Sequence, residues 1–216
     1  LKACGNIGAI DKGMKLHEEI VRRCLALGDS VMGNALVDMY ARCGLFGIAL
    51  ELFDELPSRD VISWNTLITG FVNRDLAEEA LDCMQEMHTE GVSPDAVTFV
   101  YLLNACGSIR AIEKGQQTHE EIMQMGRSLL EKDVVIGNAL VDMYAKCGML
   151  QKAQEILEEL PEPDTVCWSA LIAGYVHHGL TDEALECFSR MRDEGVVPNA
   201  VTYTCILNAC GNGGVL

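Results

Sequence analysis

An internal repeat is the feature that most restricts how this chain can fold. The stretch at residues 33–44, G-N-A-L-V-D-M-Y-A-R-C-G, returns 104 positions later at residues 137–148, with Arg42 replaced by Lys146. The same offset relates Trp64 to Trp168. A chain that repeats itself in this way is built from similar units that stack on their neighbours, so a globule with one irregular core is not expected.

Matching residues divide the sequence into repeat units of three lengths. The complete units are residues 30–60 and 134–164 with 31 residues each, 61–95 and 165–199 with 35 each, and 96–133 with 38. Residues 1–29 are predicted to be the remainder of a long unit, and residues 200–216 the first part of another. We therefore expect a single repeat array over residues 1–216, as a fragment of a longer protein.

Each repeat unit is expected to hold two α-helices. In residues 61–95, apolar residues recur at helical spacing in two stretches, separated by a break at residues 73–75. A Cys-Gly pair is predicted to make the break in short and long units, because glycine suits the left-handed backbone after a helix: Cys43-Gly44, Cys106-Gly107 and Cys147-Gly148. All five prolines fall between units, where helices must stop. No useful stretch alternates with a period of two residues, so the expected fold class is all-α.

The 35-residue units carry the most recognisable motif. Residues 61–95 open with V-I-S-W-N-T-L-I and close with G-V-S-P-D, and the W-L-G-Y pattern of 34-residue tetratricopeptide repeats is missing. These motifs resemble those of pentatricopeptide repeats, and the order of long, short and 35-residue units resembles the P-L-S subclass of that family. The resemblance covers essentially the whole chain. It implies a right-handed superhelical solenoid of helix-turn-helix repeats with a concave surface.

By this resemblance, the fifth and last residues of each unit read one RNA base. The pairs are Asn34 with Asp60, Asn65 with Asp95, Val100 with Asp133, Asn138 with Asp164, and Ser169 with Asn199, and Thr204 is the fifth residue of the incomplete unit. The family's second position holds an aliphatic side chain that sandwiches the base, here Val31, Ile62, Val97, Val135, Val166 and Val201. Short amides and hydroxyls can address a base edge while aliphatic walls hold the ring. Helix capping and turn formation are the alternative roles of these Asn and Asp residues.

The resemblance also implies a target sequence. In the family's code, Asn with Asp implies uracil and Ser with Asn implies adenine. Val100 offers no hydrogen bond, so its unit is expected to accept any base. The expected target is single-stranded RNA with the sequence 5′-UUNUA-3′, read parallel to the chain, with N opposite Val100.

The net charge of −16 at pH 7 argues against binding through a broad basic surface. The acidic residues lie mainly in the predicted second helices, whereas the first helices at residues 61–72 and 166–176 carry no charge. In pentatricopeptide solenoids the first helices line the concave face, so the negative side would face away from RNA. Arg42 and Lys146 end first helices and are the candidates for phosphate contacts, although a basic residue there also suits the helix dipole.

Nothing in the sequence supports catalysis. The H-x-E sequences at His17 and His119 begin a zinc deaminase signature, but its P-C-x-x-C part is missing, and both copies occupy equivalent repeat positions. Residues His177-His178 align with Asn73-Arg74, which makes a metal role improbable. Ten cysteines contain no C-x-x-C pair, which favours a reduced setting, and the two tryptophans are expected to pack between helices. We expect no cofactor, no metal and no enzymatic activity.

Two function classes follow from these observations. The first is a sequence-selective RNA-binding module that directs organellar RNA processing or C-to-U editing in a mitochondrion or plastid, together with protein partners of such a complex. The second is a protein-protein interaction scaffold, which the acidic balance favours. No membrane span is expected, because no run of about 18 apolar residues occurs. Self-association is expected through apolar surface at the ends of the array, near Leu1 and residues 210–216.

Overall fold

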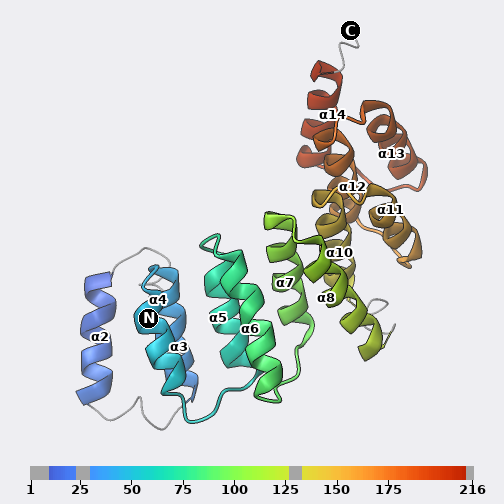
Figure 1. Cartoon of the computed structure of the whole chain (residues 1–216). Helices are drawn as coiled ribbons and strands as arrows, with labels where there is room; N and C mark the ends of the chain where they lie inside the picture. Colours follow the sequence, from blue (N-terminus) through green and yellow to red (C-terminus); the bar gives the residue numbers. More distant parts are fainter. Residues whose placement is uncertain (1–9, 23–29, 127–132, 213–216) are drawn as a thin grey trace. The chain divides into compact units, whose positions relative to one another are not determined.

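A computed structural model describes residues 10–22, 30–126 and 133–212 of the chain (Figure 1). These described residues form twelve α-helices and no strand, which confirms the all-α prediction. None of the helices within them is long and apolar enough to cross a membrane. The end surfaces predicted at Leu1 and at residues 213–216 lie outside the described residues.

The chain divides into two compact halves, residues 1–105 and 106–216, and each is described here by itself. The N-terminal half contains α2 (Ile10–Arg22), α3 (Ser30–Arg42), α4 (Phe46–Asp54), α5 (Val61–Val72), α6 (Ala77–Thr89) and most of α7 (Ala96–Ile109). The C-terminal half contains α8 (Ile112–Met125), α10 (Val134–Lys146), α11 (Leu150–Glu159), α12 (Thr165–His177), α13 (Thr181–Asp193) and α14 (Ala200–Asn212). Helices α3, α5, α7, α10, α12 and α14 each begin at the first residue of an expected repeat unit.

Within each half, a first helix packs against its own second helix and against the next first helix (Figure 1). In the N-terminal half, α3 packs on both α4 and α5, and α5 packs on α6. In the C-terminal half, α10 packs on α11 and α12, and α12 packs on α13 and α14. This nearest-neighbour packing is the arrangement expected of stacked helical repeats.

Glycine allows the first helices to approach closely. A Cβ atom built on Gly70 of α5 would lie 2.6 Å from the Cβ of Ala41 in α3. The equivalent Gly174 of α12 would place its Cβ 2.7 Å from the Cβ of Ala145 in α10. Both distances are shorter than carbon contacts allow, so any other residue would push these helices apart.

The breaks between helices agree with the sequence at two of the three predicted Cys-Gly pairs. Gly44 and Gly148 both adopt the left-handed backbone, with φ of 80°, between α3 and α4 and between α10 and α11. The prediction for Cys106-Gly107 was wrong, because α7 continues through this pair to Ile109. The left-handed residue there is Arg110, with φ of 55°, three residues beyond Gly107.

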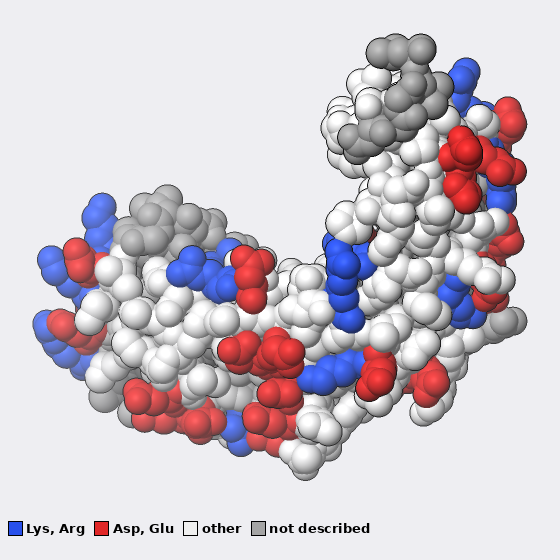
Figure 2. All heavy atoms as spheres, turned by 45° about the horizontal axis from the view of Figure 1, so that its top comes forward, with Lys and Arg blue, Asp and Glu red and all other residues white. Residues whose placement is uncertain are grey.

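The predicted packing of the two tryptophans is confirmed. Trp64 and Trp168 are each 1% exposed, and the ring of Trp64 lies edge-on to Phe53 at a centroid distance of 4.7 Å. Charge follows the helix type as expected. Helix α5 carries no charged residue, whereas α6 carries four carboxylates and no Lys or Arg. Figure 2 shows charged side chains gathered in clusters, with wide uncharged surface between them.

Candidate nucleic-acid interface

The second residue of each unit is an exposed aliphatic side chain. Each of these residues lies in the first turn of its helix, so no preceding turn of the same helix covers its side chain. Their exposed fractions run from 49% to 76%, in Val31, Ile62 and Val97 of the N-terminal half and in Val135, Val166 and Val201 of the C-terminal half. Six exposed aliphatic residues at matching positions leave apolar surface beside each reading pair, which a planar base can cover.

The pair Asn65 and Asp95 forms a closed hydrogen-bond network with Thr98, the third residue of the following unit. Asn65 Nδ2 donates to Asp95 Oδ1 at 3.0 Å, and Thr98 Oγ1 donates to Asn65 Oδ1 at 2.6 Å. The backbone N–H of Thr98 also donates to Asp95 Oδ1, at 2.9 Å. Burial by itself would raise the pKa of Asp95, but the hydrogen bonds from Thr98 and Asn65 outweigh it and lower this pKa. Asp95 is therefore ionised at neutral pH.

The short unit of residues 134–164 brings the same two residue types together without closing the network. Asn138 Nδ2 donates to Asp164 Oδ2 at 3.1 Å, so this pair meets as the sequence predicts. The Oδ1 atoms of Asn34 and Asn138 are buried and accept no hydrogen bond from the described residues. Each short unit therefore leaves one buried acceptor without a donor.

Ser169 and Asn199 are linked through Thr202 rather than directly. Thr202 Oγ1 donates to Asn199 Oδ1 at 3.1 Å and lies 2.6 Å from Ser169 Oγ. Either hydroxyl can be the donor in the contact between Ser169 and Thr202, and Ser169 donates when Thr202 gives its single hydrogen to Asn199. Ser169 is only 6% exposed, so its hydroxyl is more enclosed than a residue facing an open groove would be.

The last residue of a unit also caps the next helix, as the alternative role proposed. Asp60, Asp133 and Asp164 are the N-cap residues of α5, α10 and α12, and each accepts a backbone N–H in the first turn. An N-cap carboxylate satisfies a helix donor with one oxygen and keeps the other for a further partner. Capping and base reading are therefore compatible roles for these residues.

Two predicted reading residues differ from the others. Val100 is half-buried and lies in the N-terminal half, whereas its expected partner Asp133 belongs to the C-terminal half. Thr204 donates its hydroxyl to the carbonyl of Ala200 at 2.7 Å, within its own helix.

Each predicted phosphate contact already has a carboxylate partner. Arg42 Nε lies 2.6 Å from Asp38 Oδ1, and Lys146 Nζ lies 2.6 Å from Asp142 Oδ2. Both pairs join residues one helical turn apart. The nearby carboxylate cancels part of the charge that either cation would offer to a phosphate.

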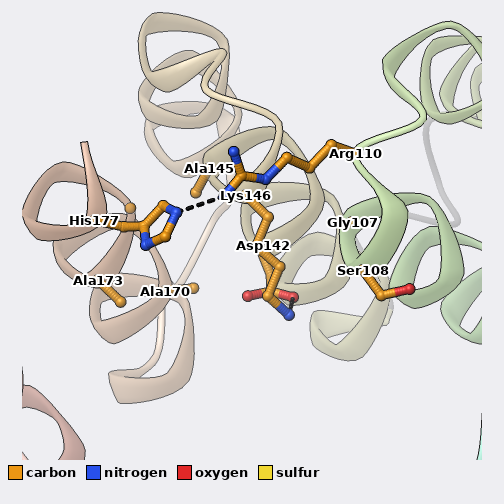
Figure 3. Close-up of a pocket in the computed structure, with 10 residues that line it drawn as sticks. Gly107, Ser108, Arg110, Asp142, Ala145, Lys146, Ala170, Ala173 and His177 are labelled. Carbon is orange, nitrogen blue, oxygen red and sulfur yellow. Dashed lines mark hydrogen bonds and ion pairs between the residues drawn. The ribbon is translucent and has the colours of Figure 1, made fainter. Parts of the chain in front are cut away.

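A cavity of about 490 Å³ in the C-terminal half brings Lys146 and Asp142 near two further basic groups (Figure 3). Arg110 reaches across it, and its Nη2 lies 2.6 Å from His177 Nε2. Sequence patterns did not single out Arg110, because its side chain is placed by the left-handed turn after α7. The cavity therefore gathers Arg110, Lys146 and His177 beside one carboxylate, Asp142.

The H-x-E sequences are packing motifs. His17 Nδ1 lies 2.9 Å from the hydroxyl of Tyr40, and His119 Nδ1 lies 2.9 Å from that of Tyr144. Burial lowers the pKa of His119. No cluster of three or more potential metal ligands occurs in residues 10–22, 30–126 and 133–212.

Four buried cysteines are packing residues too. Burial raises the pKa of the Cys83, Cys106, Cys167 and Cys187 thiols to about 12. These thiols are therefore protonated at neutral pH and lack the thiolate character that a nucleophile needs.

Sequence reasoning missed Thr98 and Thr202, which connect the reading residues. Both are the third residue of the unit that follows a 35-residue unit, and both are fully buried. The repeated A-V-T at residues 96–98 and 200–202 could have indicated them. A polar residue buried at a repeated position usually has a specific hydrogen-bond partner.

Comparisons with known proteins identify the repeats. Models described as "PPR repeat family" and "PPR repeat" match residues 59–108 and 163–212, and residues 34–61 and 138–162. A mitochondrial pentatricopeptide repeat-containing protein of Arabidopsis thaliana is 35% identical over 99% of this chain, which spans 38% of that protein. A chloroplastic one from the same plant is 34% identical over 99% of this chain and 25% of its own length.

Solved structures show the same fold. The crystal structure of the pentatricopeptide repeat protein PPR10 from maize matches 98% of this chain and 31% of its own, with a TM-score of 0.75 and 26% identity. That match confirms the predicted solenoid of helix-turn-helix repeats. A crystal structure of PPR10 in complex with an 18-nt psaJ RNA element matches 95% of this chain and 41% of its own, with a TM-score of 0.43 and 20% identity. The chain belongs to the pentatricopeptide repeat family.

Proposed function

We propose that this chain binds single-stranded RNA with one base per repeat unit and recognises 5′-UUNUA-3′. The observation that carries the proposal is the recurrence, in both halves, of a polar pair beside exposed aliphatic residues. Ile62 and Val97 flank the pair in residues 61–95, and Val166 and Val201 flank the pair in residues 165–199. Membership of the pentatricopeptide repeat family and the fold shared with maize PPR10 add support.

The hydrogen-bonding capacity of the pairs supports the base assignment. Asn65 uses one Nδ2 hydrogen on Asp95 and retains the other, while Asp95 retains lone pairs. A donor beside an acceptor complements uracil, whose Watson–Crick edge has an N–H between carbonyl oxygens. When Thr202 donates to Asn199, Ser169 gives its hydrogen to Thr202 and is left as an acceptor, and the Asn199 amide supplies donors. An acceptor beside a donor complements adenine, which has an amino group and a ring nitrogen acceptor.

The ion pairs of the two predicted phosphate-binding residues favour RNA binding that depends little on phosphate contacts. Arg42 and Lys146 lie in ion pairs with Asp38 and Asp142, so two phosphates at most are neutralised there. Two contacts on single-stranded RNA give a salt slope of roughly 1.4. Base stacking of about 1–3 kcal/mol per base must then supply most of the affinity.

We extend the proposal to a wider role, for which the names of the relatives support the organellar location. Since these are named mitochondrial or chloroplastic, we place this chain in an organelle, as a non-enzymatic module that directs RNA processing or C-to-U editing with protein partners. Assignment to the P-L-S subclass, self-association through the ends of the array, and the repeat units with the limits given above belong to the same proposal.

Selection from a random single-stranded RNA pool tests the proposal. We expect enrichment of UUNUA with no preference at the third base, and a shallow salt dependence for the winning sequence. Flat selection at every position would instead support a protein-interaction scaffold. A steep salt slope without base preference would show that phosphate contacts, and not the reading pairs, hold the RNA.

A further inference from the structure

Three units share the reading pair Asn with Asp but differ in the residue that follows. The third residue of the next unit is Ser63 after Asn34, Thr98 after Asn65 and Cys167 after Asn138. Only the unit with threonine closes a hydrogen-bond network in the described structure. Pairs with the same two reading residues therefore stand in different surroundings.

Thr98 holds the amide of Asn65 in one orientation. Its hydroxyl donates to Asn65 Oδ1 at 2.6 Å, while Asn65 Nδ2 donates to Asp95 on the other side. Rotating the amide by half a turn would break both bonds and place its oxygen against the Asp95 carboxylate. The Asn65 amide therefore presents an N–H, and not its oxygen, to a base.

No threonine hydroxyl among the described residues holds the side-chain amides of Asn34 and Asn138 in one orientation. Ser63 Oγ donates to Asp60 at 3.1 Å, and Cys167 offers only a weak thiol donor. The Oδ1 atoms of Asn34 and Asn138 stay buried without a donor from the described residues. Rotating the Asn138 amide would break only its bond to Asp164, whereas rotating the Asn65 amide breaks two bonds, so less energy separates the two orientations of Asn138.

We propose that the third residue of the following unit sets how strictly each unit discriminates between bases, with threonine as the strict residue. This inference rests on the proposed RNA binding and on the reading positions. It predicts that residues 61–95 discriminate uracil from cytosine more sharply than residues 30–60 and 134–164, although all three read the same base.

Ser169 and Thr202 extend the rule to a different pair. Thr202 occupies the place of Thr98, 104 residues later, and orients the Ser169 hydroxyl and the Asn199 amide at once. The adenine-reading unit is therefore strict as well. In this proposal the third residue of the following unit determines how sharply a unit discriminates between bases. The reading pair within the unit determines which base it binds.

The test exchanges the third residues. Cys167→Thr adds to α12 the residue that α7 and α14 already bury at this position, and Thr98→Cys is the reciprocal change. The uracil-to-cytosine preference is measured at each base of 5′-UUNUA-3′ in competition assays. Thermal melting of both variants, followed by circular dichroism, checks that they are folded.

We expect Cys167→Thr to raise the preference opposite residues 134–164 by about two- to tenfold, the range of one net hydrogen bond. Thr98→Cys lowers the preference opposite residues 61–95 by a similar factor. The final adenine is read by Ser169 and Asn199 with Thr202, none of which is changed, so its preference is expected to stay the same and serves as the internal control. Equal wild-type preferences at all three uracils, or a Cys167→Thr variant that binds with an unchanged ratio, would overturn the inference.

A measurement without RNA separates this inference from the proposed function. In nitrogen-edited NMR spectra, side-chain amide protons of Asn65 should rotate and exchange more slowly than those of Asn138. Cys167→Thr should slow those of Asn138. Slow amides in a protein that binds no RNA would contradict the function and leave the restraint by threonine standing. Equally mobile amides would disprove the restraint.

Discussion

Residues 30–95 and 134–199 are two copies of one repeat pattern. They keep the same packing residues and differ at other positions. Both copies keep a buried tryptophan, a close glycine crossing and a left-handed glycine between helices. The reading pair of the 35-residue unit changes from Asn65 with Asp95 to Ser169 with Asn199. The buried threonine that bonds to the pair is present in both copies, as Thr98 and as Thr202, so the packing around the pair accommodates this change.

The second helices differ as well. Trp64 Nε1 donates to Glu90 at 3.3 Å, but Trp168 Nε1 is buried without an acceptor among the described residues. In the later copy, Arg190 lies over the Trp168 ring at 5.5 Å and pairs with Glu194, the equivalent of Glu90. Glu86 in the second helix α6 thus corresponds to Arg190 in α13. The copy with arginine lacks the hydrogen bond from the tryptophan to the glutamate.

The largest effect is expected where the two copies agree. Gly70→Ala and Gly174→Ala should each destabilise the protein by about 1–3 kcal/mol, because the new Cβ overlaps a neighbouring helix. Gly47→Ala in α4 is the control, since nothing lies within 4 Å of its Cβ. Urea midpoints measure all three, and a neutral Gly70→Ala would show that the first helices are not close-packed there.

Exchange of the reading residues tests where the copies differ. Ser169→Asn with Asn199→Asp rebuilds around Thr202 the network that Asn65 and Asp95 form around Thr98. The last base of the target should change from A to U, by roughly tenfold or more, since a base-edge mismatch costs about 1–3 kcal/mol. Competition assays at that base decide it, and continued preference for A would refute the assigned reading positions.

The two tryptophans should respond differently to the same substitution. Trp64→Phe loses a hydrogen bond and leaves Glu90 with one partner fewer, whereas Trp168→Phe removes a donor that has no acceptor. Trp64→Phe should therefore cost about 1 kcal/mol more than Trp168→Phe. The comparison of unfolding midpoints cancels the volume change common to both, and equal losses would show that the Glu90 bond contributes nothing.

The smallest expected effect is a difference between the two copies in how acid pH changes their contribution to stability. The folded-state pKa of Asp95 is lowered below its usual value of 3.8, so its stabilising contribution is present above pH 3.8 and lost as the pH falls through the lowered value. Asn199 cannot titrate. Asp95→Asn should reduce the loss of stability between pH 5 and pH 3, measured by urea unfolding. An unchanged acid dependence would show that the network does not favour the ionised form.

The sequence by itself determined the repeat, the helix pairs and the candidate reading residues. These follow from local rules, since periodic apolar residues and N-cap carboxylates act within a few residues of the chain. The 104-residue offset then carried each assignment from one copy to the other. Gly44 and Gly148 terminated helices as expected for the same local reason.

Only the tertiary structure decided which side chains restrain one another. Thr98 meets Asn65 across 33 positions, and Arg110 meets His177 across 67, through helix packing that no local pattern encodes. The wrong prediction at Cys106-Gly107 has a similar cause, because α7 continues as a helix there with Gly107 against α10, where an added Cβ atom would lie 3.3 Å from the Met143 backbone. Helix ends and buried hydrogen bonds depend on what a neighbouring unit places beside them, which is decided when the units stack.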